Sequence, residues 1–344
     1  MQQEKIKVNL SGVSQTLLGP LWSRAKISRD HNSLFYDAKA VELIGKIDYD
    51  FSTRDKVILG YLSLLFVARA KQFDDKIRAY IREHPRTSVV NIGAGLDTTF
   101  YRVDNGLIHW YDLDLPAVIA LRKQLLSEPD RITYIAKSFL DQSWCKDINT
   151  ENGVFMIAGG LLRYFEESQV RQFFSSLADN LPGSEIVFDV ESKLDNDFGA
   201  WIEQLPPAQR EELRTTWAEM LKGWWDKAPQ DQKDKLNDMI TTLKLPIKSK
   251  GKELFDFEAW WNQLSAKETE EVWRDFRAFS NWRLAKWALE DANEITKWDS
   301  RIIVVGQFPL YRNIPRDPSL SIEIRQFMDY SDKSERVNIL HLRV

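Results

Sequence analysis

The sequence predicts an α/β protein built on a parallel sheet with helices on both faces. Short apolar runs recur near residues 88–93, 107–112, 132–136, 153–158 and 185–190. Helical spacing fills the segments between them, which is typical of strand–helix repeats. The first run ends in a Gly-Ala-Gly turn, and the second ends in two acids. Together these observations predict a Rossmann-like sheet that binds its ligand at the carboxyl ends of the strands.

Gly93 and Gly95 follow the first strand directly. Glycine adopts dihedrals that other residues avoid and lets the backbone approach a bound molecule. A dinucleotide fingerprint needs a third glycine at position 98, where this chain has Thr98. A nucleoside with its charge in an amino-acid tail is therefore favoured over a pyrophosphate, and S-adenosylmethionine fits that description. Asp97, the acid of the turn, joins the two glycines as a candidate cofactor-binding residue.

The second strand ends in Asp112 and Asp114, ahead of Pro116, which is suited to the first turn of a helix. Sheets of this type place an acid about 20 residues after the glycines, where it accepts hydrogen bonds from ribose hydroxyls. Both acids are candidates for this position. The alternative for the acid that does not bind ribose is to cap the helix predicted at 115–128.

The remaining elements divide the chain into three predicted parts. Residues 1–85 form an N-terminal helical segment that covers the cofactor, with an amphipathic pattern over 55–83. Residues 86–194 and 297–344 form the core, which regains strand-like sequence at 301–305 and 337–342. Residues 195–296 interrupt it as a Trp-rich helical cap or lid. We expect most of its tryptophans to pack within the cap and one to three to reach a pocket for an apolar or aromatic acceptor.

Six segments carry a resemblance that runs in order over residues 11 to about 192 and resumes near 298–344. They read TLLGPLWSRA (16–25), FYDAKAVELIGKIDYDF (35–51), NIGAGLDTTFYRVDNG, HWYDLDLPAVIALRK, YIAKSFLDQSW (134–144) and IAGGLLRYFEESQV (157–170). Together they resemble the leucine carboxyl methyltransferase family, and most closely its bacterial branch of polyketide-biosynthesis O-methyltransferases. The resemblance implies a class I S-adenosylmethionine-dependent methyltransferase with a seven-stranded Rossmann-like sheet, N-terminal helices and a helical cap insertion.

The resemblance also implies roles for single residues at the cofactor. Arg69 matches an arginine that pairs with the methionine carboxylate, which suits a planar guanidinium. Arg24 stands where the family has another basic residue near the same end. Gly93 matches the first glycine under the cofactor, and Asp114 matches the ribose-binding acid.

Two further places of the family pattern lie at the ends of the third and fourth strands. Ser138 and Phe139 stand where many relatives have Asp-Leu beside the adenine. Gly159 stands where relatives have a glutamate facing the cofactor. A charged hydrogen bond of that kind is worth roughly 1.5–3 kcal/mol, so its loss would weaken cofactor binding about tenfold or more unless another group substitutes.

Three residues are candidates for the transfer step itself. In-line methyl transfer needs mainly alignment and exclusion of water, and only a phenol or alcohol acceptor benefits from a base. His31, one of four histidines, is the candidate base, with a surface or helix-capping role as the alternative. Arg163 and Tyr164 could orient an acceptor carboxylate or hydroxyl. Alternatively, Arg163 pairs with Glu166 or Glu167 at helical spacing.

Composition narrows the class of protein. The chain has 344 residues, 43% of them hydrophobic, with 47 basic and 51 acidic residues and a net charge of −4. Basic residues do not cluster, so we expect no nucleic-acid partner. The single cysteine, Cys145, is expected to be buried and unreactive. No signal peptide, membrane span or metal-ligand spacing is apparent, so a cytoplasmic monomer or homodimer without a metal is expected.

The main functional hypothesis is a small-molecule O-methyltransferase acting on a carboxylate or hydroxyl. A protein C-terminal carboxyl methyltransferase is the alternative within the same fold, although a large cap argues mildly against an open peptide groove. A degenerate cofactor-binding or interaction protein is a third hypothesis, prompted by Gly159. A nicotinamide-dependent oxidoreductase is the least favoured, because position 98 is not glycine.

Overall fold

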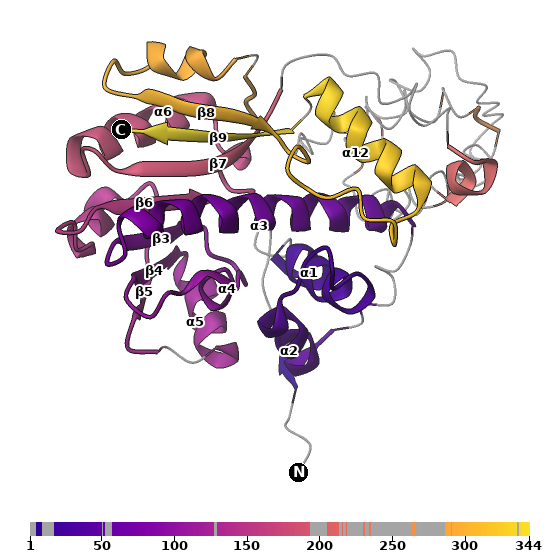
Figure 1. Cartoon of the computed structure of the whole chain (residues 1–344), viewed down its shortest axis with the longest axis horizontal. Helices are drawn as coiled ribbons and strands as arrows, with labels where there is room; N and C mark the ends of the chain where they lie inside the picture. Colours follow the sequence, from indigo (N-terminus) through magenta and orange to yellow (C-terminus); the bar gives the residue numbers. More distant parts are fainter. Residues whose placement is uncertain are drawn as a thin grey trace. The chain divides into compact units, whose positions relative to one another are not determined.

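A seven-stranded sheet is the main element of the computed structural model (Figure 1). The structure describes residues 5–8, 17–49, 51, 57–126, 129–192, 205–212, scattered positions from 215 to 268, and 286–289, 291–335 and 337–344. The strands lie in the order β5-β4-β3-β6-β7-β9-β8. Their bounds are β3 Ser88–Ile92, β4 His109–Asp114, β5 Ile132–Ala136, β6 Val154–Ala158, β7 Glu185–Glu191, β8 Ile303–Pro309 and β9 Val337–Arg343.

The five strands β3 to β7 are parallel, and the C-terminal pair is antiparallel. From β3 the chain adds β4 and β5 on one side of the sheet, and then returns to add β6 and β7 on the other side of β3. The direction of winding therefore reverses between β3 and β6. Strand β9 runs antiparallel between β7 and β8. This order places the ligand-binding edge at the carboxyl ends of β3, β4 and β6. The predicted seven-stranded Rossmann-like sheet is confirmed.

Helices cover both faces of the sheet, as expected for buried parallel strands. The 27-residue helix α3 (Val57–Glu83) runs along one face (Figure 1), where its Phe73 and Ile77 join a cluster with Val89 and Ile157. The opposite face packs against α6 (Glu167–Asn180) and the short helix η3 (Gln142–Asp147). Other helices are α4 (Phe100–Val103), α5 (Pro116–Leu125), η4 (Leu162–Tyr164), η5 (Ala292–Lys297) and α12 (Ile322–Ser334).

The N-terminal segment packs against the carboxyl edge of the sheet. Helices α1 (Leu18–Asp30) and α2 (Ala38–Lys46) lie beside each other, and a two-stranded sheet joins β1 (Ile6–Lys7) to β2 (Ile47–Asp48). Leu21 and Leu43 of the helices are fully buried and share a cluster with Leu96 of the turn after β3. This packing holds the helices next to the predicted cofactor turn.

The chain divides into two compact units. The first comprises 1–55, 60–196 and 285–344, and the second comprises 56–59 and 197–284. Most of the second unit lies outside the described residues, so the Trp-rich cap stays a prediction. Residues 285–296 differ from the predicted boundary because they belong to the first unit, where Trp287 is 5% exposed and packs in the core with Trp298.

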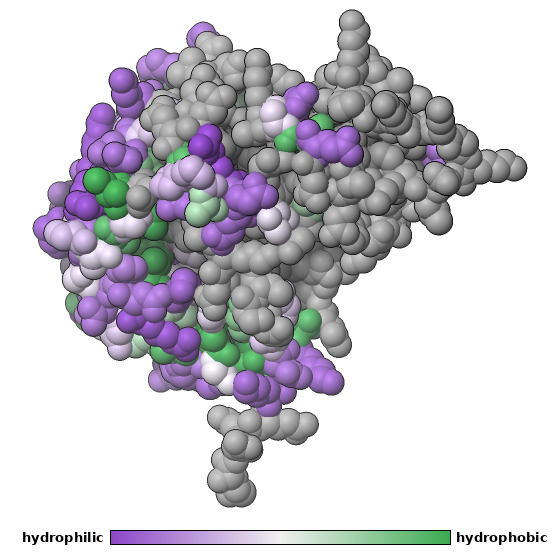
Figure 2. Space-filling model, turned by 90° about the vertical axis from the view of Figure 1, so that its right-hand side faces the viewer, coloured by the Kyte–Doolittle hydropathy of each residue, from purple (hydrophilic) through white to green (hydrophobic). Residues whose placement is uncertain are grey.

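Large apolar side chains that remain exposed in the described residues come from several elements, including Ile303 and Val305 on the edge strand β8. Figure 2 shows hydrophilic residues interspersed with smaller hydrophobic areas over the described part of one face. Among the described residues, no helix combines the length and apolar character needed to cross a membrane.

Candidate cofactor and active site

The turn after β3 has the backbone that its glycines predicted. Gly93 and Gly95 adopt φ values of +69° and +47°. The N–H groups of Gly93 and Ala94 both donate to the Leu113 carbonyl of β4, at 2.8 and 3.1 Å. A Cβ on Gly93 would lie 2.9 Å from the Leu161 side chain. Glycine is therefore required here by both conformation and space.

Asp114 lies at the carboxyl end of β4, directly against this turn. Its Oδ2 accepts the Gly95 N–H at 2.8 Å, and its Oδ1 accepts the Leu115 N–H at 2.7 Å. Burial raises the pKa of Asp114, and these two N–H groups oppose the rise. The side chain is only partly buried, and its oxygens keep lone pairs beyond those two bonds. Asp114 thus meets the requirements for a ribose-binding acid.

Asp112, the other candidate for the ribose position, has a different environment. It is fully buried, and its carboxylate accepts hydrogen bonds from Asn91 at 3.0 Å, Trp110 at 2.9 Å and Arg122. Burial raises the pKa of Asp112, while Arg122 opposes the rise. Neither Asp112 nor Asp114 caps α5, whose N-cap is Leu115. We assign Asp112 to supporting Arg122.

Arg122 of α5 holds the glycine turn from behind. Its Nη1 donates to the carbonyls of Ala94, Gly95 and Asp97, at 3.3, 2.9 and 3.0 Å. The residue is 2% exposed, and its charge is balanced by Asp112. The guanidinium therefore fixes the carbonyls on one side of the turn and leaves the N–H side to other partners.

Asp97 lies beside Arg24, and its side chain is 23% exposed. Its Oδ1 is 3.8 Å from Nη1 of Arg24, and its Oδ2 accepts the N–H of Thr99 at 3.1 Å. Burial alone would raise the pKa of Asp97, but Arg24, Arg102 and the Thr99 hydrogen bonds together lower it to about 2. Asp97 is therefore ionised at neutral pH and acts as a partner for the arginines.

Arg24 and Asp97 belong to a larger group that we call the charge network, defined by Arg24, Asp37, Asp74, Asp97 and Arg102. Asp37, the N-cap of α2, is fully buried and accepts from Arg24 at 3.1 Å and from Arg102 at 2.6 Å. Arg102 also binds both oxygens of Asp74 on α3, at 2.8 and 2.9 Å. The charge network thereby joins α1, α2, α3 and α4 to the turn after β3.

Arg69 of α3 lies at the carboxyl end of β6. It is 9% exposed, and its Nη1 donates to Oδ2 of Asp189 on β7 at 2.9 Å. The guanidinium lies against Gly160, whose hypothetical Cβ would be 2.6 Å from Nη1. Next to it, Gly159 leaves a space where a Cβ would be 3.5 Å from Arg69 Nε. Arg69 is thus placed beside the carboxyl ends of β6 and β7.

Ser138 and Phe139 follow β5 at the same edge of the sheet. Ser138 is partly buried, and its hydroxyl accepts the Leu140 N–H at 3.3 Å. Phe139 is 5% exposed and packs edge-on against Phe165 and Phe173. Since the Phe139 ring belongs to the core, only its backbone is left for the predicted position beside the adenine.

His31 lies at the C-cap of α1, where its Nδ1 is 3.0 Å from the Ser319 hydroxyl. Ser33 close by donates to Asp317 at 2.7 Å. These contacts tether the end of α1 to residues 317–319, and within the described residues no hydrogen bond joins the His31 side chain to the glycine turn. This arrangement agrees with the alternative role in capping and surface contact, and the catalytic role of His31 stays a prediction.

Arg163 and Tyr164 lie on η4, just after the turn at Gly160. Arg163 pairs with Glu191 at the carboxyl end of β7. Its predicted alternative partners are engaged elsewhere: Glu166 binds Lys286 and Glu167 binds Arg171. Tyr164 is partly buried. The structure thus brings η4 to the carboxyl edge while compensating the positive charge of Arg163.

Cysteine and metal chemistry have no support in the described part of the chain. Cys145 is 5% exposed in the core, and burial raises the pKa of its thiol to about 11. The thiolate required of a nucleophile is therefore disfavoured. The described side chains contain no group of three or more His, Cys, Asp or Glu residues able to hold a metal ion.

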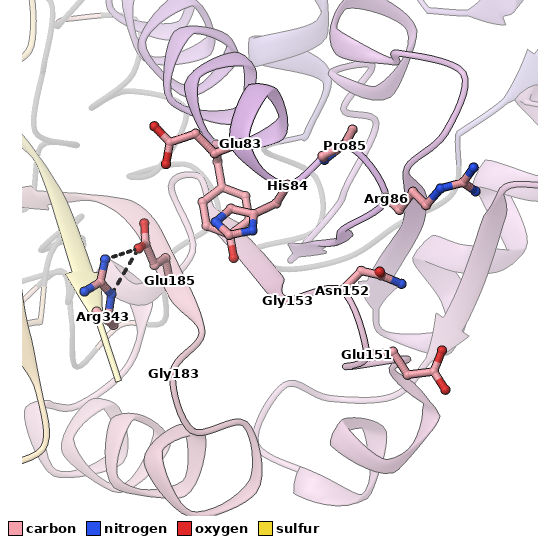
Figure 3. A pocket seen from close by; sticks show the side chains of 11 residues that line it. Glu83, His84, Pro85, Arg86, Glu151, Asn152, Gly153, Gly183, Glu185 and Arg343 are labelled. Atoms are coloured by element: carbon pink, nitrogen blue, oxygen red, sulfur yellow. Dashed lines mark hydrogen bonds and ion pairs between the residues drawn. The ribbon is translucent and has the colours of Figure 1, made fainter.

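A cavity of about 580 Å³ lies at the opposite edge of the sheet (Figure 3). Its lining includes Gly153, Gly183 and Glu185, which precede or begin β6 and β7, and His84 from the loop after α3. Figure 3 shows Glu185 and Arg343 joined across neighbouring strands on one side of it. Because these are the amino ends of the parallel strands, this cavity is separate from the glycine turn.

The groups at the carboxyl edge fit a nucleoside with an amino-acid tail. Asp114 offers a carboxylate for ribose hydroxyls, Arg69 offers a guanidinium for a carboxylate, and the glycine turn permits close approach. Asp37, Asp74, Arg102, Arg122, Gly160 and Asp189 were not identified from the sequence. For most of them the partner is far away in the chain, so no local pattern marks the contact.

Comparison with known proteins places the site in a family context. The family model described as leucine carboxyl methyltransferase matches residues 18–178. The tetracenomycin polyketide synthesis O-methyltransferase TcmP of Streptomyces glaucescens is 31% identical over 188 residues, which cover 53% of this chain and 67% of that protein. The S-adenosyl-L-methionine-dependent methyltransferase dpfgK of Gibberella zeae is 27% identical over 210 residues, covering 56% and 70% respectively.

Among solved structures, an O-methyltransferase family protein from Burkholderia thailandensis aligns over 95% of this chain and 71% of that chain, with 13% identity and a TM-score of 0.37.

Proposed function

Since the chain belongs to the leucine carboxyl methyltransferase family, we propose that it transfers a methyl group to an oxygen atom of a small metabolite. The enzyme class is a methyltransferase, and the methyl donor is S-adenosylmethionine. The observation that carries the proposal is the meeting of Asp114, the glycine turn and Arg69 at the carboxyl edge of β3, β4 and β6. The relative named as an O-methyltransferase supports oxygen as the acceptor atom.

In this proposal the chain's residues mainly bind and orient. S-adenosylmethionine supplies a methyl group attached to a positively charged sulfur. Asp114 would accept hydrogen bonds from the ribose hydroxyls, and Arg69 would pair with the methionine carboxylate. Arg122 keeps the glycine turn in the shape that close backbone contact requires. Alignment of this kind can supply most of the acceleration of an in-line displacement.

The acceptor is proposed to meet η4, where Tyr164 could orient its hydroxyl or carboxylate. Arg163 could orient a carboxylate, but its ion pair with Glu191 compensates its positive charge. The proposal therefore gives an anionic acceptor no preference over a neutral hydroxyl. A phenol or alcohol acceptor would gain from a base, and His31 is the residue to test by substitution with alanine.

A methylation assay tests the proposal. The purified protein is incubated with S-adenosylmethionine carrying a labelled methyl group and with a panel of phenols and carboxylic acids, alongside peptides with free C-termini. The proposal predicts label on a small acceptor and none on the peptides. Label on the peptides alone would support the protein carboxyl methyltransferase instead. Bound cofactor with no acceptor methylated would contradict methyl transfer to this class of metabolite.

A further inference from the structure

The negative charge that balances Arg69 comes from strand β7. The functional meaning given to this contact below rests on the function proposed above. In the part of the chain that the structure describes, the hydrogen-bond partner of the Arg69 guanidinium is Asp189, at 2.9 Å from Nη1. Both side chains are buried, 10% and 5% exposed. A charge at this depth is costly unless it is paired, so Asp189 decides whether Arg69 can remain at this position.

The strand register explains why residue 189 reaches Arg69. Strands β6 and β7 pair Ile157 with Val187 and Ala158 with Phe188. Because side chains alternate between faces, the next positions, 159 and 189, lie side by side on the face covered by α3. Ile157 and Val187, two residues earlier on that face, both pack in the cluster that contains α3 side chains.

Position 159 is the other place from which an acid would contact this arginine. A Cβ built on Gly159 would lie 3.5 Å from Nε of Arg69 and 3.1 Å from Cε2 of Phe73. A glutamate there would therefore extend along the guanidinium, once the Phe73 ring gives way by a few tenths of an ångström. With glycine at 159, no described residue places an acid on this side of Arg69, and Asp189 of the neighbouring strand supplies the counter-charge.

Asp189 also fixes the turn on which Arg69 rests. Its Oδ1 accepts the Gly160 N–H at 2.5 Å, while its Oδ2 accepts from Arg69. Gly160 has φ of +68°, and its missing Cβ leaves room for the guanidinium. One carboxylate thus sets the relative position of the arginine and the backbone after β6.

We propose that Asp189 is a positioning residue that holds Arg69 for the carboxylate of the methyl donor, and that it substitutes for an acid at position 159. Asp189 engages only Nη1, and within the described residues Nε and Nη2 make no hydrogen bond. In this proposal these remaining donors bind the ligand carboxylate. Arg69 then keeps a counter-charge although residue 159 is glycine.

The test compares two ligands that differ in the group Arg69 would bind. S-adenosylhomocysteine carries the amino-acid tail, and 5′-methylthioadenosine lacks it. Calorimetric titration of Asp189→Asn should show about tenfold weaker binding of S-adenosylhomocysteine than wild type, the effect of losing one charged hydrogen bond. Binding of 5′-methylthioadenosine should be unchanged. Equal or tighter binding of S-adenosylhomocysteine, or equal weakening of both ligands, would overturn the proposal.

Moving the acid back to position 159 gives the matched rescue. The double variant G159E/D189N should recover most of the lost affinity for S-adenosylhomocysteine, and the control G159Q/D189N, of the same size but uncharged, should not. Recovery in both or in neither would overturn the proposal. If Asp189→Asn does not fold, the proposal predicts that G159E/D189N folds and binds S-adenosylhomocysteine, whereas G159Q/D189N does not. Failure of the wild type to bind either ligand would instead refute the proposed function, and this inference with it.

Discussion

Gly160 is the residue with the least freedom to change at the carboxyl edge. It combines φ of +68° with a guanidinium where its Cβ would be. We expect Gly160→Ala to destabilise the fold by about 1–3 kcal/mol through backbone strain and to displace Arg69, weakening S-adenosylmethionine binding. Thermal unfolding and calorimetric titration of the variant measure the two effects.

Gly106 provides the matched control for Gly160. It has φ of +80°, yet nothing lies within 4 Å of its hypothetical Cβ. Gly106→Ala should therefore lower the melting temperature through strain alone and leave cofactor affinity unchanged. Equal loss of affinity in both variants would mean that displacement of Arg69 is not the cause.

Single residues show where sequence information ends. Gly93, Gly95 and Asp114 could be singled out because each stands at a fixed place relative to a strand end. The structure gives both glycines positive φ values and places Asp114 against their turn. Asp112 looked equivalent to Asp114, but it faces Arg122 inside the protein. Strand alternation does not distinguish two acids spaced by two residues, since both point to the same face.

At the scale of elements, α5 controls the shape of the turn after β3 through Arg122. We expect Arg122→Lys to raise the KM for S-adenosylmethionine about tenfold. A single ammonium group cannot contact the carbonyls of the turn through one nitrogen and Asp112 through another, as Nη1 and Nη2 of Arg122 do. Steady-state kinetics with a methyl acceptor measures this change. Gln124→Ala, at an exposed position of the same helix, should leave the KM unchanged, and an equal KM for Arg122→Lys and wild type would contradict this role.

The charge network joins the N-terminal helices to the turn after β3, and we expect its contribution to stability to depend on pH. The pKa of Asp97 is lowered from 3.8 to about 2 by Arg24 and Arg102 despite burial. A lowered carboxyl pKa contributes stability that is present above pH 4 and lost as the pH falls through 2. We expect Asp97→Asn to cost on the order of 2 kcal/mol of unfolding free energy at pH 6.

Denaturant unfolding of wild type and Asp97→Asn at several pH values between 6 and 2.5 checks this contribution. The difference between the two proteins should shrink as the pH is lowered, even though Asp74 and Asp112, whose pKa values are raised by burial, alter the pH dependence of both. A difference independent of pH would show that Asp97 contributes through packing and not through its charge.

The elements themselves were largely predictable, whereas the contacts between them were not. Apolar runs marked the strands, and Pro116 marked the start of α5. The pairing of Asp37 with Arg102 joins residues 65 positions apart, which no local pattern reveals. Arg163 illustrates the same limit, since helical spacing suggested Glu166 or Glu167, and the structure pairs it with Glu191 from β7.

At the scale of the whole molecule, the order of the strands is the one expected of a methyltransferase of this family. The order β5-β4-β3-β6-β7-β9-β8 puts the glycine turn, Asp114 and Arg69 at one edge. Trp287 looks like the tryptophans before it in the sequence, yet its indole N–H donates to the Leu162 carbonyl at 2.7 Å within the core. Composition alone does not distinguish a core tryptophan from one in a cap.

The central claim is that this edge binds S-adenosylmethionine, with Asp114 at the ribose and Arg69 at the carboxylate. Calorimetric titration of wild type, Asp114→Ala and Arg69→Ala with S-adenosylmethionine and with 5′-methylthioadenosine tests it most directly. We predict that wild type binds both ligands, that Asp114→Ala weakens both, and that Arg69→Ala weakens only S-adenosylmethionine. Undetectable S-adenosylmethionine binding by wild type, or unchanged affinity in both variants, would contradict the claim.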